Sequence, residues 1–181
     1  MTKPNFTPIV LRRERPEDIP AIHALNLSAF GGPGEAKVVD LLRERCSDSD
    51  FVSVVAEMAG RVVGQVLFTP VTLRAEDGRT LDGMGLAPLA VLPEAQNQGI
   101  GSILCRAGLE EIESSGAPFV VVLGSPAYYS RFGFEPAQQY QLRCTYGDVP
   151  PGAFMVKVFR LQQMQGLSGV VHYQPEFDQV T

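Results

Sequence analysis

The most regular pattern of apolar and polar residues lies between positions 86 and 118. An apolar run over 86–92 is followed by a short polar turn and then by Gly99-Ile100-Gly101-Ser102. Beyond the glycines, apolar residues recur at steps of three and four, which predicts an amphipathic helix. Two serines, a glycine and a proline over 114–118 predict its end. The pattern therefore predicts a strand, a glycine turn and a helix.

Three strand-like runs lead into this unit. Residues 51–57 are dense in β-branched side chains, residues 62–73 form a longer run, and residues from 81 onward continue into the central strand. Turn residues at 58–61 and 76–79 separate the runs. We therefore expect three antiparallel strands joined by hairpins.

The N-terminal part predicts one strand and two helices. Residues 9–12 form a short apolar strand, and Arg15-Pro16-Glu17-Asp18 places proline and acidic residues in the first turn of a helix. The glycine-rich stretch 31–34 ends that helix, and Val38, Leu41 and Leu42 mark the apolar side of a second one.

After the central helix, residues 118–124 are almost all apolar, which suits a strand that is buried on both faces and parallel to its predecessor. A short helix follows Pro126, and further strands are expected from 132–136, 153–161 and 170–173. The fold class is therefore α+β, or mixed α/β. We expect a mostly antiparallel, twisted central sheet with one β-α-β unit, helices on both faces and a single domain over 1–181.

Composition narrows the function classes. The 181 residues are 45% hydrophobic and 19% charged, with a net charge of -5. An acidic chain is a poor candidate for binding nucleic acid or an anionic membrane. The three cysteines are odd in number and widely spaced. This pattern predicts a cytoplasmic protein with neither a disulfide framework nor a metal site. Cys105 falls on the predicted helix, where we expect it to be a core residue. We find no signal peptide pattern and no apolar run of membrane-spanning length.

The glycine turn is a candidate anion site. The start of a helix leaves about four backbone N–H groups without partners, and the helix dipole favours negative charge there. Because Gly99 and Gly101 lack side chains, a phosphate could approach the backbone closely. A tight turn without a ligand is the alternative. The dinucleotide fingerprint fails because Leu104 replaces its third glycine, and the P-loop fails because no Gly-Lys-Ser/Thr follows.

Two motifs resemble one known family. The segment Gln96-Asn97-Gln98-Gly99-Ile100-Gly101 is similar to the Gln/Arg-x-x-Gly-x-Gly/Ala pyrophosphate loop of the GNAT superfamily of N-acetyltransferases. Thirty residues later, Tyr129 to Phe134 resembles the Tyr-x-x-x-Gly-Phe segment that closes the acyl-coenzyme A site of that family. The resemblance covers nearly the whole chain. Residues 123–129, 154–156 and 172–175 are similar to the YhbS-like branch of predicted bacterial acetyltransferases.

The resemblance implies a set of site residues and an acetyl-coenzyme A (acetyl-CoA) co-substrate. Tyr129 would be the acid that protonates the departing thiolate, although its neighbour Tyr128 could be confused with it. Pro88 suits the bulge that separates the central strand from its neighbour in that family, and the alternative is an ordinary buried strand with an edge proline. Many family members carry Lys or Arg where this chain has Gln98, so Arg106 and Arg131 are candidates for phosphate contacts, or else ordinary surface charges. The donor would be bound by Leu89, Ala90 and Val91 along the pantetheine, and by Gln96, Asn97, Gln98, Gly99, Ile100, Gly101 and Ser102 at the pyrophosphate.

No general base is evident. Histone-type relatives carry a glutamate on the central strand where this chain has Gly85. Asp82 is near, but strand alternation points it to the other face unless a bulge intervenes. Glu57 and His23 could act through water, or be ordinary surface or capping groups. A water chain, or an amine that arrives unprotonated, could replace a base. The resemblance also makes Phe30 to Glu35 a candidate acceptor loop, whose alternative is a flexible link.

We therefore expect an N-acetyltransferase that transfers acetyl from acetyl-CoA to a primary amine of a small molecule or protein, by direct attack in a ternary complex. The alternatives are a non-catalytic acyl-CoA-binding sensor or scaffold, and a structural subunit that keeps only the fold. The apolar strand expected at 154–159 could pair across a homodimer.

Overall fold

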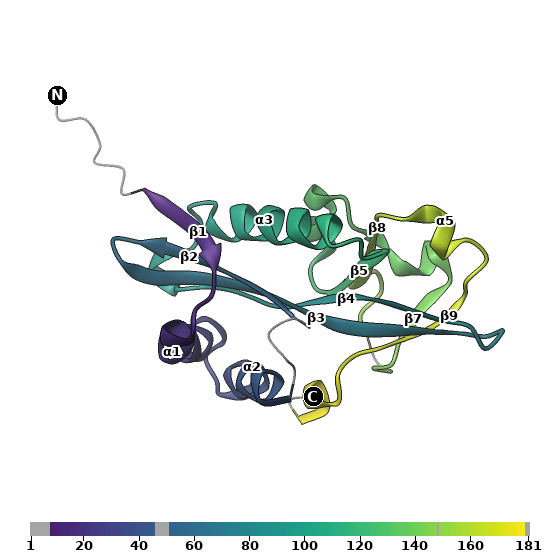
Figure 1. Cartoon of the computed structure of the whole chain (residues 1–181), viewed down its shortest axis with the longest axis horizontal. Helices are drawn as coiled ribbons and strands as arrows, with labels where there is room; N and C mark the ends of the chain where they lie inside the picture. Colours follow the sequence, from purple (N-terminus) through teal and green to yellow (C-terminus); the bar gives the residue numbers. More distant parts are fainter. Residues whose placement is uncertain (1–7, 46–50, 148, 180–181) are drawn as a thin grey trace.

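The computed structural model describes residues 8–45, 51–147 and 149–179. Its centre is a nine-stranded sheet in the order β1-β2-β3-β4-β5-β8-β6, with β9 paired to the distal half of β3 and β7 paired to β9 (Figure 1). The strands are β1 (Ile9–Arg13), β2 (Val52–Met58), β3 (Arg61–Ala75), β4 (Thr80–Val91), β5 (Phe119–Leu123), β6 (Glu135–Pro136), β7 (Leu142–Cys144), β8 (Phe154–Val158) and β9 (Gly169–His172). The helices are α1 (Ile19–Phe30), α2 (Gly34–Arg45), α3 (Ile100–Ser114), α4 (Pro126–Tyr129) and α5 (Leu161–Met164).

Helices cover both faces of the sheet. Figure 1 shows α3 on one face, and α1 and α2 on the other beside the C-terminal segment. Alternation along β3 assigns its side chains to these layers. A Cβ at Gly64 would lie 2.8 Å from the Leu104 side chain of α3, whereas Gln65 accepts a hydrogen bond from Asn26 of α1 at 3.0 Å. We call these the α3 face and the α1/α2 face.

The long hairpin of β3 and β4 organises the site. The two strands pair from Gly64↔Val91 to Arg74↔Thr80, with one register shift between Val66 and Phe68 of β3. Opposite that shift, β4 advances by three residues, from Leu86 to Leu89, so the extra residue lies at Ala87–Pro88. This β-bulge is where Pro88, which has no N–H to give to a ladder, predicted one.

The β4 and β5 strands separate at the same point. They pair in parallel at Met84↔Val120, Gly85↔Val121 and Leu86↔Val122, and no pairing continues beyond Leu86 among the residues that the structure describes. Because β4 runs on to Val91, its last five residues face a gap where a neighbouring strand would otherwise lie. The predicted parallel crossover through α3 is confirmed.

The mixed α/β class and the mostly antiparallel sheet are also confirmed. The C-terminal third differs from the expectation. Residues 130–132 form a 3-10 turn before the two-residue strand β6, and α5 begins at Leu161, where a strand was expected to end. The short β7 was missed altogether, because Leu142–Cys144 is too short to show a period.

The expected dimer edge is partly covered. One side of β8 pairs with β5 along its whole length, and the other side pairs with β6 at Met155 and Val156. Pairing of this strand across a homodimer therefore stays a prediction. Within the described ranges, no helix has the length and apolar character needed to cross a membrane.

Candidate active site

A cleft of about 840 Å³ opens on the α3 face where β4 and β5 separate. The end of β4, the loop before α3, and the start of α4 form its walls. The loop after β5 contributes Gly124 and Ser125, which belong to the 123–129 segment that carries the resemblance but were not predicted as site residues. The lining residues are Leu89, Val91, Ala95, Gln96, Asn97, Gly99, Ile100, Gly101, Ser102, Gly124, Ser125, Tyr128, Tyr129 and Arg131.

The glycine turn presents backbone N–H groups to this cleft. Asn97 and Gly99 adopt left-handed backbone conformations, with φ of 60° and 83°, and the Gln96 side chain donates a hydrogen bond to the Val91 carbonyl at 3.0 Å. The first helical bonds run from Ser102 and Ile103 to the Gly99 carbonyl. Within the described part of the chain, the amides of Gly99, Ile100 and Gly101 have no backbone acceptor. The turn therefore has the free donors that an anion at a helix start requires.

Most of the predicted donor-binding residues meet in this cleft. Ala90 and Gln98 are the exceptions. Ala90 is paired with Gln65, so its side chain lies on the α1/α2 face, and only its backbone could serve a ligand at the gap. Gln98 is exposed, and its amide donates to the Glu94 carbonyl at 3.3 Å.

Both tyrosines line the cleft, at different depths. A Cβ at Gly101 would lie 2.8 Å from the Tyr128 hydroxyl, and Ser102 hydrogen-bonds to the same hydroxyl. Tyr129 is packed edge-on against Phe134 and covers Gly124, where a Cβ would come within 2.4 Å of its ring. Burial raises the pKa of both phenols above the ordinary value, so both stay protonated at neutral pH. Tyr128 thus sits over the helix start, and Tyr129 sits deeper against β5.

The two candidate arginines differ in position. Arg131 lines the cleft, and its guanidinium lies 4.4 Å from the centroid of the Tyr128 ring. Its Nε donates to the Tyr128 carbonyl at 3.1 Å, which leaves the rest of the guanidinium free to meet an anion. Arg106 lies over Phe132 at 5.1 Å and is not among the lining residues. Of the two, Arg131 is the one that lines the cleft.

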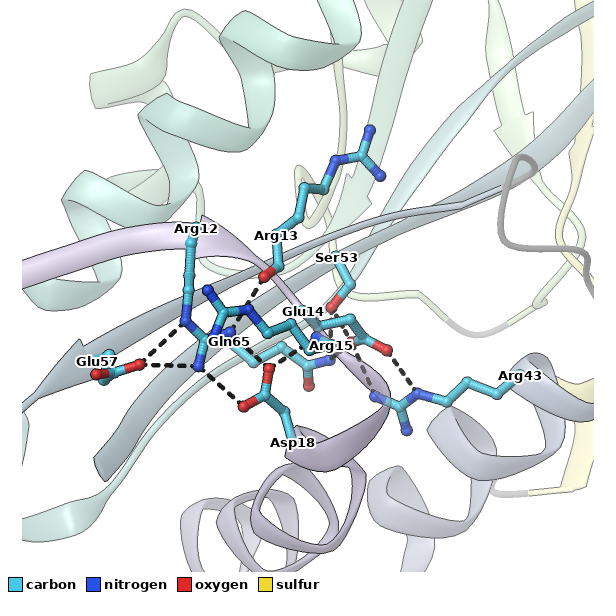
Figure 2. A network of polar contacts seen from close by, with 9 residues as sticks. All are labelled: Arg12, Arg13, Glu14, Arg15, Asp18, Arg43, Ser53, Glu57 and Gln65. Carbon is cyan, nitrogen blue, oxygen red and sulfur yellow. Dashed lines mark hydrogen bonds and ion pairs between the residues drawn. The ribbon is translucent and has the colours of Figure 1, made fainter. Parts of the chain in front are cut away.

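The candidate bases lie away from the cleft lining. Glu57 accepts two hydrogen bonds from Arg12, which also binds Asp18 at 2.6 Å (Figure 2). His23 Nδ1 lies 2.6 Å from Asp40 between α1 and α2, and Asp82 accepts a hydrogen bond from Thr72 at 2.8 Å. Each of these three groups already interacts with another side chain of the protein.

Gly85 has no room for the glutamate of histone-type relatives. A Cβ there would lie 2.9 Å from Tyr173 Cε1 and 2.9 Å from Val71 Cγ1. Real Cβ atoms essentially never approach other atoms that closely. Position 85 therefore has to be a glycine, because the Tyr173 ring occupies the space that any larger side chain would need.

Comparison with known proteins identifies the family. The family model for the acetyltransferase (GNAT) domain matches residues 10–137. The chain belongs to the GNAT family. It is 38% identical, over 94% of its length and 99% of the relative's, to the uncharacterised N-acetyltransferase YhbS of Escherichia coli K12.

Two solved GNAT structures resemble this one over nearly the full chain. The crystal structure of YhbS from E. coli in complex with CoA has a TM-score of 0.87 at 37% identity, covering 100% of this chain and 97% of that one. A GNAT family acetyltransferase from Brucella melitensis in complex with acetyl-CoA has a TM-score of 0.76 at 31% identity, covering 96% and 100%. The resemblance inferred from the two motifs is thereby confirmed, and so is the GNAT fold.

Proposed function

We propose that this protein is an acetyl-CoA-dependent N-acetyltransferase that acts on a primary amine of a small molecule or protein. The single observation that carries the proposal is the row of free amides at the start of α3, which faces a cleft ending at the β4–β5 gap. Relatives with this fold were solved with CoA and acetyl-CoA, which supports the same donor here. The sheet joins strands from β1 to β9, which supports a single domain.

In this proposal the helix start and Arg131 bind the pyrophosphate. The free amides at Gly99–Gly101 supply donors without a charged side chain in the loop, and Arg131 supplies the positive charge that Gln98 cannot. The pantetheine lies along Leu89, Ala90 and Val91, whose strand has lost its neighbour at the gap. A backbone N–H from this stretch would stabilise the charge that develops on the thioester oxygen.

The reaction is a direct attack within a ternary complex. The amine nitrogen bonds to the thioester carbon, the carbon–sulfur bond breaks, and the sulfur leaves with its electron pair. Tyr129 is the proposed acid for the thiolate, with Tyr128 as its competitor. Because an ordinary thiol has a pKa of about 8.5, the thiolate is already a fair leaving group, and positioning contributes more than the acid does.

A non-catalytic acyl-CoA-binding protein is the second candidate. One observation favours it: no carboxylate or imidazole group is found among the cleft-lining residues that the structure describes. Release of free thiol from acetyl-CoA in the presence of an amine separates the two candidates, because a sensor binds the donor without turning it over.

The first experiment is thermal unfolding with and without acetyl-CoA. A ligand at a hundred times its dissociation constant stabilises the folded state by roughly 2.7 kcal/mol. We expect acetyl-CoA to raise the unfolding midpoint of wild type. The rise should be lost in Gly101→Glu, because the new carboxylate would lie at the helix start and repel the phosphates of the ligand. Gly32→Glu is the matched control, since nothing lies within 4 Å of a Cβ at Gly32. No rise in well-folded wild type would refute the donor site.

Thiol release is measured next, with a panel of primary amines. Turnover with any of them establishes the enzyme. A midpoint rise without turnover across the panel would favour the binding protein.

A further inference from the structure

Two buried hydroxyl groups flank Gly85 on the α1/α2 face. The first belongs to Tyr173. Its ring carbon Cε1 lies 2.9 Å from a Cβ at Gly85, whereas Cδ1 lies 3.3 Å away, so the hydroxyl-bearing end of the ring is the nearer one. The second belongs to Thr69, which is fully buried and is the β3 partner of Gly85. Directly paired residues of an antiparallel ladder have their Cβ positions about 4.5–5.5 Å apart. Both hydroxyls therefore belong to the immediate surroundings of one glycine.

Neither hydroxyl has a hydrogen-bond partner among the described residues. Tyr173 Oη and Thr69 Oγ1 are buried and unpaired, and the third such side-chain atom, Asn26 Oδ1, lies on the same face of the sheet. A buried hydroxyl without a partner is costly, so each such group in a native structure needs an explanation. Tyrosine normally keeps its polar tip in water, whereas here the residue is only partly buried and its hydroxyl is fully buried.

The chain holds Tyr173 in this orientation from both sides. His172 pairs with Thr72 of β3, and the Gln174 amide donates to the Pro70 carbonyl at 3.0 Å. The ring is packed against Tyr146 and Phe177, with centroids 5.7 Å and 5.6 Å away. The Tyr173 ring is therefore held in place while its hydroxyl has no partner among the described residues.

The hydroxyls of Tyr173 and Thr69 lie near the β4–β5 gap, where the proposed transfer would take place. The last paired residues of β4 and β5 are Leu86 and Val122, so the gap opens two residues beyond Gly85. The donor cleft lies on the α3 face of that gap, while the two hydroxyls lie on the α1/α2 face. An acceptor that approaches from the α1/α2 face would meet the thioester from the side opposite to the donor's phosphates.

We propose that Tyr173 and Thr69 are acceptor-side positioning residues, whose hydroxyls together hold one water that accepts the proton of the attacking primary amine. This inference rests on the proposed acetyl transfer. It supplies a route for the amine proton in a chain that has Gly85 where histone-type relatives carry a glutamate. As the nitrogen–carbon bond forms and the carbon–sulfur bond breaks, the amine proton passes to this water and on to solvent. The sulfur keeps the bonding electron pair.

Tyr173 stays neutral throughout. Burial raises its pKa well above the ordinary value, so it orients the water rather than exchanging its own proton. The titratable groups that bear on it are Tyr146 and Cys144, and burial also raises the pKa of both.

The test removes each hydroxyl and keeps the shape, with Tyr173→Phe and Thr69→Val. The matched control is Tyr140→Phe, whose hydroxyl donates to the exposed Glu135 at 2.6 Å. The probes are ethylamine, which is protonated at neutral pH, and hydroxylamine, which is not. We expect kcat/KM for ethylamine to fall roughly 10- to 100-fold at pH 7, with a smaller loss at pH 9 and with hydroxylamine. The acetyl-CoA midpoint rise and the unfolding midpoint should stay at wild-type values or above.

Three results would overturn the proposal: an equal loss at every pH and with both amines, a loss that tracks lower stability, or no loss. If wild type binds acetyl-CoA but turns over no amine, the proposed transfer fails and a second measurement decides this inference. It is a high-resolution crystal structure with CoA. A water bonded to both Tyr173 Oη and Thr69 Oγ1 supports the pair, and direct packing without water refutes it.

Discussion

The two sides of the β4–β5 gap are built in different ways. On the donor side, the end of β4, the glycine turn, α3 and the tyrosine segment follow one another between residues 86 and 134. On the proposed acceptor side, Thr69 and Gly85 face each other on the β3–β4 hairpin, and Tyr173 comes from the segment after β9, 88 positions beyond Gly85. The proposed donor site is thus encoded by local segments with recognisable spacing, whereas the proposed acceptor side depends on how the sheet is assembled.

The polar groups differ in the same way. The donor side offers exposed side chains and backbone amides that have no backbone acceptor among the described residues. Elsewhere on the α1/α2 face the polar groups bond to one another in a partly buried network: Gln65 donates to Glu14 at 3.1 Å and to Ser53 at 2.9 Å, and Arg43 binds Glu14 (Figure 2). A buried network tolerates fewer substitutions, because each lost partner leaves an unpaired polar group.

The largest expected effect is on the acceptor side. Gly85→Glu should lower the free energy of unfolding by about 4 kcal/mol, because its Cβ overlaps Tyr173 and Val71 and its carboxylate is buried. Urea denaturation measures the change, with Gly32→Glu as the control in open space. A stable Gly85→Glu protein would show that the Tyr173 ring can move aside, and would weaken the contrast between the two sides.

Next in size is the choice between the two tyrosines of the donor side. Tyr129→Phe should lower kcat roughly 50-fold if its hydroxyl is the acid. Tyr128→Phe should mainly weaken acetyl-CoA binding, because the Tyr128 hydroxyl contacts the helix start. Steady-state kinetics with the best amine separates kcat from KM. The reverse pattern would assign the acid to Tyr128.

A smaller effect concerns the ion pairs that join β1 and β2 to the start of α1. Arg12 binds Asp18 at 2.6 Å and lowers the pKa of that buried carboxyl. Asp18→Asn should therefore cost about 1.5 kcal/mol of stability at pH 7. The wild-type advantage is present above the ordinary carboxyl pKa and is lost as the pH falls through the lowered one, so the two stability curves should converge in acid.

Urea denaturation between pH 2 and pH 7 measures this convergence. Asp77→Asn is the control, because Asp77 pairs with Arg79 on the surface and its loss should be undetectable. A constant gap between Asp18→Asn and wild type at all pH values would mean that the carboxylate charge is not what stabilises this region.

The smallest effect should be at the phosphate end. Arg131→Gln is expected to raise the dissociation constant for acetyl-CoA about 5-fold, near 1 kcal/mol for an exposed charge pair, and less so in high salt. Arg106→Gln should leave it unchanged, because Arg106 lies outside the cleft lining. Titration calorimetry at two salt concentrations gives both numbers. Equal effects of the two arginines would indicate long-range attraction rather than contact.

Local patterns in the sequence determined the donor side of this protein. The strand, turn and helix around Gly99 and the tyrosine segment are short-range features, whose periodicity and turn residues are visible without the fold. The bulge at Pro88 was equally readable, because a proline cannot give an N–H to a ladder.

Only the tertiary structure decided the acceptor side. Gly85 appeared in the sequence as a missing glutamate, and the fold shows that Tyr173, 88 positions later, occupies that space. Strand alternation pointed Asp82 to the face opposite Gly85, but it could not say which side chains from other strands would surround either residue. Contacts between distant segments depend on sheet order and register, which no local pattern contains, and the approach of the Tyr173 ring to Gly85 is such a contact.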